Sequence, residues 1–400
     1  MIETFTANTK TKLLETEEKI IPLNFVKKKS ERLYFLDWLR VTAFAILIIM
    51  HTAEVFADRG GWIKNTETSR ELTYILLFFR QWRMPLLFII SGAAVSMMLK
   101  KISTVEFLKS RGIHILLPLL AGMIIIIPPQ IYYINHAEGS FLQIYQDVFT
   151  FNWFPKGNFH WLHLWYLAFL FAFTIILTPL IITLKTEKGK TWIDSICKRL
   201  NYSYVLFTLA LLLEAPFYLV NLWKPRSDLS ALLFYFPYFA FGALLFTNPG
   251  IRSTFKIYKQ KSLILAVATT SILYLFFWIT DDRNHTVVEP ILTQQVNDSL
   301  HMLLETLNRW FWLITFFGYS MQYLNFGSRS LSYANKAVYP FYILHQTVII
   351  MLAYYVVKFP GNMTYKFIAI LSFTFIIIMA LFEFVLKRTK ITRMLFGIKL

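Results

Sequence analysis

Residues 37–92 read DWLRVTAFAILIIMHTAEVFADRGGWIKNTETSRELTYILLFFRQWRMPLLFIISG, and this stretch decides the fold. It holds most of two apolar segments, 33–56 and 72–99, each long enough to cross a bilayer. These segments carry one histidine and three arginines: Arg40, His51, Arg80 and Arg83. Because a charged side chain inside hydrocarbon costs from about 3 to about 15 kcal/mol, a functional site is the first hypothesis. The alternative is that each arginine pairs with a carboxylate and only joins helices.

The same apolar pattern recurs along the whole chain. Of the 400 residues, 56% are hydrophobic and only 16% are charged, whereas about 25% of the residues of a soluble domain are charged. The sequence therefore predicts an all-α, polytopic membrane bundle of about ten transmembrane helices. The expected spans are 33–56, 72–99, 113–134, 161–184, 203–222, 229–247, 262–280, 299–325, 336–357 and 366–386.

The positions of Lys and Arg predict the orientation of the bundle. If the N-terminus is cytoplasmic, the basic residues in the cytoplasmic connections outnumber those on the opposite side by more than two to one, as expected for membrane proteins. Both termini and the connection 185–202, which contains the only cysteine, Cys197, are then cytoplasmic. This bias explains much of the net charge of +17, so the expected partner is the bilayer and not nucleic acid.

Three divisions of the chain follow from this map. We expect a cytoplasmic N-terminal segment (1–32), a transmembrane domain (33–386) and a basic cytoplasmic tail (387–400).

The first span places a cation and an imidazole on one helix face. Arg40 and His51 are eleven residues apart, which is about three turns or about 16 Å along a helix. Asp37 is a candidate ion-pair partner of Arg40, and Glu54 is placed to orient the His51 ring or raise its basicity. Histidine is the usual general base near neutral pH, so His51 is the candidate catalytic base with Glu54 beside it. The alternative for His51 is a polar residue that packs between helices.

The second span carries Arg80 and Arg83 one turn apart, and two guanidinium groups on one face can hold a phosphate, a carboxylate or an oxyanion. Later spans add further polar groups that are expected to support the site: His163, His301, Glu305, Arg309, Tyr342 and His345. The lone carboxylates Glu214 and Glu383 are candidate counterions for the arginines. No metal-ligand spacing, phosphate-binding glycine loop or serine-nucleophile motif occurs in the sequence.

Two connections on the outer side have unusual compositions. Residues 135–160 are rich in aromatic side chains, including Trp153, and Trp161 follows at the start of the fourth span. Flat aromatic faces beside polar groups suit a sugar, so both tryptophans are candidate acceptor-binding residues. The alternative is the ordinary aromatic belt at a membrane surface. The connection 281–298 is acidic.

Several motifs in this order resemble the membrane acyltransferase-3 family. They are the pair Arg40 and His51, the Arg80-x-x-Arg83 motif within FRQWRMPLLFIISG (79–92), HLWYL (163–167) and YILH (342–345). The last three resemble the glucan biosynthesis protein C branch of that family, and the similarity extends over most of the chain.

The resemblance implies a reaction and a set of roles. The protein would be a multi-pass enzyme of the inner (cytoplasmic) membrane that transfers an acyl group, acetyl or succinyl, from cytoplasmic acyl-CoA to a hydroxyl of an extracytoplasmic glycan or glycolipid. It would have no tightly bound cofactor. His51 would be the catalytic base, and Arg40, Arg80 and Arg83 would bind the donor or stabilise an oxyanion.

Two other functions remain open at the level of the residues. A secondary transporter could use buried His and Arg side chains to relay protons or bind an anionic solute. A polysaccharide or lipid-carrier export factor could place the same residues in its bundle without acyl chemistry.

Overall fold

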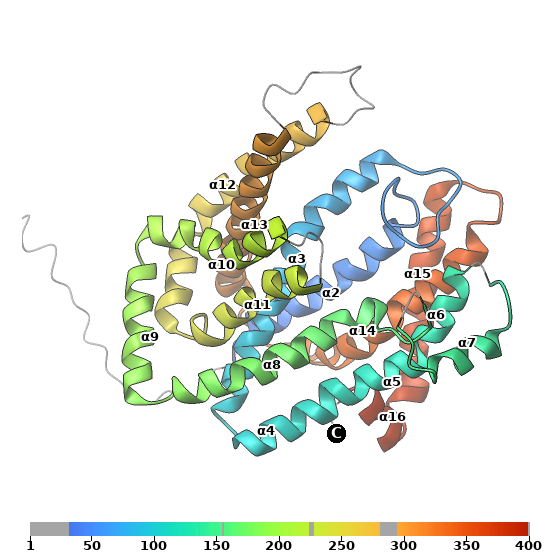
Figure 1. The fold of residues 1–400 in the computed structure, drawn as a ribbon, viewed down its shortest axis with the longest axis horizontal. Helices are drawn as coiled ribbons and strands as arrows, with labels where there is room; N and C mark the ends of the chain where they lie inside the picture. Colours follow the sequence, from blue (N-terminus) through green and yellow to red (C-terminus); the bar gives the residue numbers. More distant parts are fainter. Residues whose placement is uncertain (1–31, 136, 154–155, 224–227, 281–293, 399–400) are drawn as a thin grey trace, which may run out of the picture. The chain divides into compact units, whose positions relative to one another are not determined.

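Long apolar helices make up most of the described chain (Figure 1). The computed structural model describes residues 32–135, 137–153, 156–223, 228–280 and 294–398. These residues contain no strand, and their only β-type pairs are the isolated bridges Ala57–Ser69 and Trp153–Phe159. The long helices are α2 (Tyr34–Ala53), α3 (Arg70–Leu99), α8 (Trp165–Thr183), α9 (Glu187–Leu200), α10 (Ser203–Trp223), α11 (Asp228–Leu244), α12 (Pro249–Thr280), α13 (Gln294–Tyr323), α14 (Arg329–Val356) and α15 (Met363–Leu381).

Shorter helical segments complete the described chain. They are α4 (Thr104–Arg111), η1 (Gly112–Leu116), α5 (Leu117–Ile125), α6 (Ile127–Ile134), α7 (Phe141–Val148), η2 (Leu162–Leu164), η3 (Phe382–Leu386) and α16 (Lys390–Leu395). The segments η1 and η3 are π-helical, and η2 is a 3₁₀ turn.

Seven helical segments of the described chain are long and apolar enough to cross a membrane, or eight if the bent pair α9–α10 forms one span. The protein is therefore a multi-pass membrane protein. Three of the ten expected spans do not pass this test on their own. They coincide with α10, with the 17-residue helix α11 and with α13, whose polar residues lower its hydropathy. The expected N-terminal segment and most of the acidic connection 281–298 lie outside the described residues.

Glycines permit a close contact between helices α3 and α11. A Cβ atom built on Gly92 of α3 would lie 2.0 Å from the carbonyl oxygen of Phe239. One built on Gly242 of α11 would lie 2.1 Å from the carbonyl oxygen of Ile89. Only glycine permits such an approach from both sides, as expected where small residues line a membrane helix. This packing fixes the position of α3, which carries Arg80 and Arg83.

The first span lies among several helices of the bundle. Helix α2 packs against α3, α13, α14 and α15 (Figure 1). The first span ends at Ala53, three residues earlier than expected, so Glu54 lies in the connection to α3. Helix α3 begins after Ser69, whose side chain caps the helix by accepting a hydrogen bond from the Leu72 amide. The connection 54–69 therefore starts at the His51 end of α2 and leads to the start of α3.

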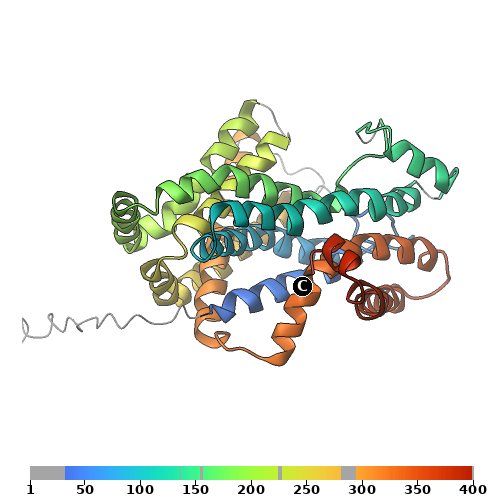
Figure 2. The same ribbon diagram turned by 90° about the horizontal axis from the view of Figure 1, so that it is seen from below.

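Several of the connections between helices lie together at one end of the bundle. Figure 2 shows α6, α7 and the loop after them at the same end as the connection between α14 and α15. The hydroxyl groups of Tyr133 on α6 and Tyr355 on α14 are 3.1 Å apart there. The packing of α6 on α14 therefore brings the start of the loop rich in aromatic residues to the last turns of α14.

Candidate active site

His51 lies in the last turn of α2 and contacts a carboxylate that in turn contacts an arginine. The Nδ1 atom of His51 is 2.8 Å from one carboxylate oxygen of Glu54. The Nη2 group of Arg80 donates to the other oxygen over 2.7 Å. A carboxylate at Nδ1 holds the ring in place and keeps the proton on that nitrogen, which leaves Nε2 as a proton acceptor. The expected contact between His51 and Glu54 is present, and Arg80 extends it.

Residues of the connection after α2 hold the backbone of Glu54 in place. The ammonium group of Lys64 donates to the backbone carbonyl of Glu54 over 2.8 Å. Gly60 and Gly61 have φ angles of +79° and +75°, in the left-handed region that favours glycine. A Cβ atom at Gly60 would lie 2.5 Å from Nη2 of Arg80, and one at Gly61 would lie 2.7 Å from the Glu54 carbonyl oxygen. Lys64 was not expected from the sequence, although the Gly-Gly pair before it is a signal of a tight turn.

The Glu54 carboxyl group remains ionised in this environment. Burial raises its pKa, but the hydrogen bonds and positive charges of His51 and Arg80 have the opposite and larger combined effect, and they lower the pKa from 4.5 to about 2. Burial also lowers the pKa of the nearby Lys64 ammonium. The His51 ring therefore faces a permanent negative charge at any pH near neutrality.

Arg83 has a different environment from Arg80. It is 7% exposed, and its Nη1 group donates to the sulfur of Met50 over 2.8 Å. Its Nε group has no hydrogen-bond partner, and Arg83 forms no ion pair with a carboxylate of the described residues. A buried guanidinium without a counterion is unfavourable on its own, so this position favours an anionic or strongly polar ligand.

Two further histidines line the same region. The ring centroid of His345 on α14 lies 5.3 Å from that of His51 and 5.4 Å from that of His163 on η2. The Nδ1 group of His345 is 2.6 Å from the Tyr342 carbonyl oxygen, and the Tyr342 hydroxyl donates to the His163 carbonyl over 2.6 Å. The expected residues His163, Tyr342 and His345 are thus brought to His51. Within the described chain, no group of three or more His, Cys, Asp and Glu residues could hold a metal ion.

Only His51 among these rings has a carboxylate partner. Both ring nitrogens of His163 are engaged, with Gln130 at 2.7 Å and with the Ile343 carbonyl at 2.9 Å. His345 uses Nδ1 for its own helix backbone. His163 thus has both ring nitrogens engaged, whereas His51 has a carboxylate at Nδ1, which is the arrangement expected of a general base. Gln130 was not expected from the sequence; an amide side chain after Pro128 and Pro129 in an apolar span was the available signal.

Unpartnered polar atoms gather around the three imidazoles. Buried polar atoms in proteins nearly always have hydrogen-bond partners. Four buried atoms here have none among the described residues: Arg83 Nε, Gln130 Nε2, His345 Nε2 and Gln346 Oε1. The region around His51 thus presents donors and acceptors that a polar substrate can use.

Arg40 lies toward the other end of α2. It is half-buried, and its charge acts on Arg111, the last residue of α4, and on Tyr166. The Tyr166 hydroxyl is 2.6 Å from the Ser91 hydroxyl. Arg40 and Arg111 together place two cations on the side of the bundle away from Glu54. The ion pair expected between Asp37 and Arg40 stays a prediction.

Arg309 belongs to a second polar cluster that does not contact His51. Its Nη1 group donates to the buried carboxylate of Glu214 on α10, and its Nε group donates to the Gln81 carbonyl of α3 over 2.9 Å. The hydroxyl groups of Tyr238 and Thr306 also donate to Glu214. Glu214 is thus the counterion expected for one of the arginines, and the cluster joins α3, α10, α11 and α13.

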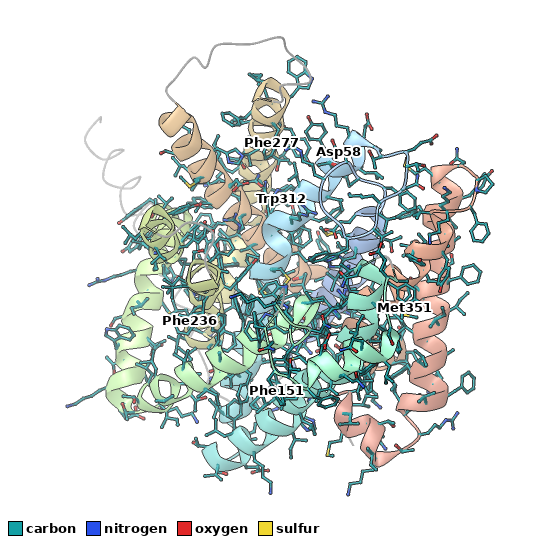
Figure 3. All side chains as sticks on the ribbon, turned by 45° about the vertical axis from the view of Figure 1, so that its right-hand side comes forward. Asp58, Phe151, Phe236, Phe277, Trp312 and Met351 are labelled. Atoms are coloured by element: carbon teal, nitrogen blue, oxygen red, sulfur yellow. The ribbon has the colours of Figure 1, made fainter. Side chains whose placement is uncertain are left out.

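The rest of the polar stripe on α13 also lies apart from His51. The Nε2 atom of His301 is 3.9 Å from Glu305, and the His301 ring packs against Phe276 and Phe277 of α12 (Phe277 is labelled in Figure 3). Glu305 lies 4.0 Å from Arg309.

The other candidate counterion, Glu383, was assigned wrongly. It pairs with Lys387, its neighbour one turn later on the helix, and with the Tyr333 hydroxyl. It therefore forms no ion pair with Arg40, Arg80 or Arg83.

The two tryptophans expected to bind the acceptor pack together. The ring centroids of Trp153 and Trp161 are 4.7 Å apart with nearly perpendicular planes, and Trp153 is 42% exposed. Leu162, the next residue, has a φ angle of +36°, which is rare for a side-chain-bearing residue and costs about 1–3 kcal/mol. This strained residue directly precedes His163, so one short segment joins the histidine cluster to the aromatic pair, of which Trp153 is exposed and Trp161 is half-buried.

An apolar cavity of about 210 Å³ lies between α2, α3 and α13. Leu39, the neighbour of Arg40, lines it toward one end of α2, and Trp82, the neighbour of Arg83, lines it on α3. Trp82 is 4% exposed, and its indole N–H has no hydrogen-bond partner among the described residues. The cavity is therefore lined by sequence neighbours of both arginines and not by the arginines themselves.

Comparison with known proteins identifies related chains. A family profile described as "Acyltransferase domain" matches residues 33–383. The chain is 22% identical over 378 residues to "Glucans biosynthesis protein C" of Shigella dysenteriae serotype 1 (strain Sd197), and equally to the proteins of that name in Escherichia coli K12 and O157:H7 (strain EC4115 / EHEC). Each match covers 90% of this chain and 92% of the relative. No solved structure matches the chain.

Proposed function

The chain belongs to the acyltransferase-3 family and is an enzyme that transfers acyl groups, and from this premise we propose that it moves an acyl group from cytoplasmic acyl-CoA to a hydroxyl of an extracytoplasmic carbohydrate. The name of its relatives, which share most of their length with this chain, favours a glucan as the acceptor. Acetyl and succinyl are the acyl groups that we propose. A transporter or an export factor without acyl chemistry does not account for the family assignment.

The contact between His51 and Glu54 is the observation that carries the mechanism. As the acceptor hydroxyl oxygen attacks the thioester carbonyl carbon, Nε2 of His51 takes the hydroxyl proton. The C–S bond of the tetrahedral intermediate then breaks, and the imidazolium returns the proton to the sulfur of coenzyme A. The products are an ester and the free thiol. Glu54 stabilises the transient imidazolium without being protonated, since its pKa is about 2.

Arg83 is the proposed oxyanion partner. Its charge acts on His345 and Tyr342, so it lies beside the histidine cluster, and its Nε group is unused. A preorganised cation in a water-poor site stabilises the negative charge that develops on the thioester oxygen. Arg80 acts indirectly in this mechanism, because its guanidinium is already engaged by Glu54.

The donor is proposed to reach this point from the cytoplasmic side. Arg40 and Arg111 would attract the phosphates of coenzyme A. Its slender arm would thread between α2 and α3, where the apolar cavity lies, and one of its amide carbonyls would accept a hydrogen bond from Trp82. The distance from Arg40 to His51 along α2 is about 16 Å, which is similar to the length of that arm.

The acceptor is proposed to enter from the opposite side. The exposed Trp153 and the half-buried Trp161 offer apolar faces for a sugar ring, and the chain runs directly from this pair to His163. This arrangement requires both termini in the cytoplasm and about ten spans in the inner membrane, as the distribution of Lys and Arg predicts.

The test uses the full chain reconstituted in liposomes, with donor and acceptor supplied on chosen sides. One orientation of the protein is first inactivated by an external protease. Transfer should require acyl-CoA on the cytoplasmic face and glucan on the other, with one thiol released for each ester formed. His51→Ala should lower the rate by about 10²–10⁴-fold, as loss of a general base usually does. His301→Ala, a histidine remote from the site, is the matched control and should keep the rate.

Two results would contradict the proposal. Efficient transfer with both substrates confined to the external face would exclude passage of the donor arm through the bundle. A folded His51→Ala protein with the wild-type rate would exclude His51 as the base.

A further inference from the structure

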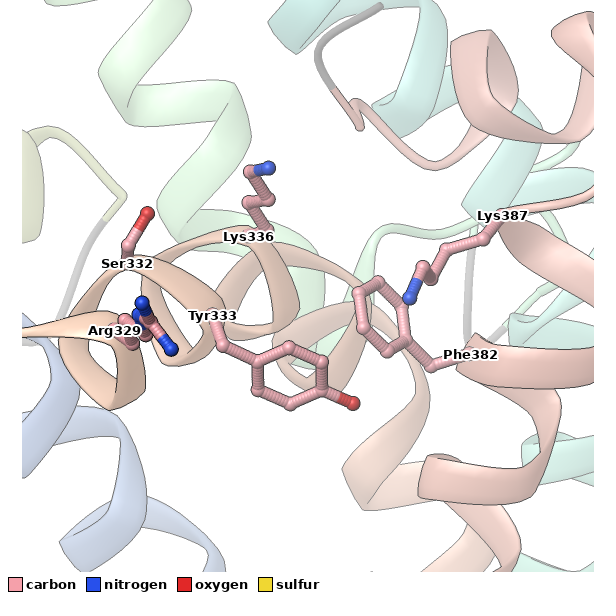
Figure 4. Close-up of a pocket in the computed structure, with 6 residues that line it drawn as sticks. All are labelled: Arg329, Ser332, Tyr333, Lys336, Phe382 and Lys387. Atoms are coloured by element: carbon pink, nitrogen blue, oxygen red, sulfur yellow. The ribbon is translucent and has the colours of Figure 1, made fainter.

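A cavity of about 280 Å³ lies between the start of α14 and the end of η3 (Figure 4). Its lining residues come from both elements: Arg329, Ser332, Tyr333, Lys336, Phe382 and Lys387. The four residues from α14 stand at positions i, i+3, i+4 and i+7, so they form one helical stripe. The cavity thus combines three cations with two aromatic rings.

Most of this positive charge is not balanced by a carboxylate of the described residues. Lys387 is paired with Glu383, with N–O distances of 2.9 and 2.8 Å, and its ammonium lies 5.1 Å from the centre of the Phe382 ring. Arg329 and Lys336 form no ion pair with any described residue. One carboxylate therefore faces three cations, and the cavity is complementary to an anion.

The surroundings of the cavity are those of a lipid-facing surface. Beyond it on η3, Phe384 and Val385 are 72% and 46% exposed. The following residues add Arg388, Lys390 and Arg393 next to the end of this span. Basic clusters at the end of a membrane helix attract anionic lipids, and basic pockets between such helices bind their headgroups.

The position of the cavity on α14 argues against a role in holding the acyl donor. Lys336 and His345 are nine residues apart, which is two and a half helical turns, so they point to opposite sides of α14. The same separation relates Tyr333 to Tyr342. A ligand in this cavity therefore lies on the side of α14 away from the histidine cluster.

We propose that this cavity binds the phosphate headgroup of an anionic phospholipid, with the acyl chains lying along the exposed apolar side of η3 and α15. Arg329 and Lys336 supply the charge that the phosphate neutralises, and Ser332 and Tyr333 line the space between them. The ligand would join the start of α14 to the end of the last long helix. This binding does not depend on acyl transfer.

The test measures thermal unfolding of the full chain in a neutral detergent after removal of lipid. Phosphatidylglycerol should raise the unfolding temperature in a saturable manner, because a ligand of the folded state stabilises it. Phosphatidylcholine, inorganic phosphate and free coenzyme A at the same concentration should not produce this shift. The double variant Arg329→Gln and Lys336→Gln should bind phosphatidylglycerol about 10–30-fold more weakly.

Two further variants separate the cavity from general surface charge. Lys198→Gln with Arg199→Gln removes one exposed lysine and one exposed arginine elsewhere and should leave the lipid effect unchanged. Ser332→Trp fills the cavity, keeps every charge and should abolish the effect.

Three results would overturn the proposal. They are equal stabilisation of the wild type by phosphatidylcholine, undiminished binding by Ser332→Trp, and stabilisation by coenzyme A that the double variant loses. The last would assign the cavity to the donor nucleotide. The first uses only the wild-type chain and so does not require that any variant folds.

Discussion

Single residues of the first two spans differ in how their charges are balanced. Arg80 is neutralised by Glu54 at 2.7 Å, whereas Arg83 has only the sulfur of Met50 and an unused Nε group. Two arginines one turn apart thus have separate tasks. Arg80 holds the carboxylate that orients His51, and Arg83 is available to a substrate.

This difference predicts unequal effects of replacing each arginine by lysine. Arg83→Lys should lower the transfer rate at saturating donor by at least about tenfold, because an ammonium lacks the planar group of donors that guanidinium offers. Arg80→Lys should be milder, since a point charge still attracts Glu54. Steady-state kinetics of both variants measure this order. The reverse order would assign the oxyanion to Arg80.

The ionisation of Glu54 predicts how stability depends on pH. Folding lowers its pKa from 4.5 to about 2, so its stabilising contribution is complete above pH 4.5 and is lost as the pH falls toward 2. A shift of this size corresponds to roughly 3 kcal/mol. Unfolding temperatures of the wild type and Glu54→Gln, compared between pH 6 and pH 3, should converge as the pH falls. A constant difference across that range would contradict the assignment.

At the level of helices, buried polar contacts hold the bundle together where apolar packing cannot, because lipid is as apolar as the helix surfaces. The Glu214–Arg309 pair joins α10 to α13, and Arg309 also binds the backbone of α3. His301 and Glu305, on the same stripe, add only long contacts. The polar residues of α13 therefore position α3 and are not part of the candidate active site.

Removing one member of this pair should destabilise the protein more than removing both. Glu214→Leu leaves Arg309 buried with only the 4.0 Å contact to Glu305 and should cost about 3–5 kcal/mol. Glu214→Leu combined with Arg309→Met removes both charges and should cost less than Glu214→Leu alone. A double-mutant cycle by thermal unfolding measures the difference. Additive effects would show that the pair is not coupled.

At the scale of the whole molecule, the orientation in the membrane decides which substrate meets which face. Cys197 is a poor probe of orientation, because it is buried with only 4% exposure. Ser195, two residues earlier on α9, and Ser140, in the connection before α7, are both exposed. With Cys197 replaced by serine, a membrane-impermeant maleimide should label Ser140→Cys in intact cells and Ser195→Cys only after permeabilisation. The opposite pattern would invert the topology.

The sequence predicted most of the helices because a bilayer demands apolar segments of about 20 residues, and that demand is visible in composition alone. It also predicted the contact of His51 with Glu54, which are one helical turn apart. Contacts between distant segments were beyond such reasoning. Glu214 and Arg309 are separated by 95 residues, and the bond from Lys64 to Glu54 depends on the path of a glycine turn. The spacing of residues along the sequence reveals neither of these two contacts.

The ion pair between Glu54 and Arg80 also bears on how the protein is made. α2 and α3 follow each other in synthesis, so Glu54 has left the ribosome before Arg80 and is present when α3 enters the translocon. An arginine near the centre of a lone helix costs about 2.5–3.5 kcal/mol during insertion, and a carboxylate on the preceding connection offsets part of that cost. The residue that orients the proposed catalytic base is therefore also expected to aid biogenesis. The quantity of inserted protein has to be measured before the low activity of any Glu54 variant is assigned to chemistry.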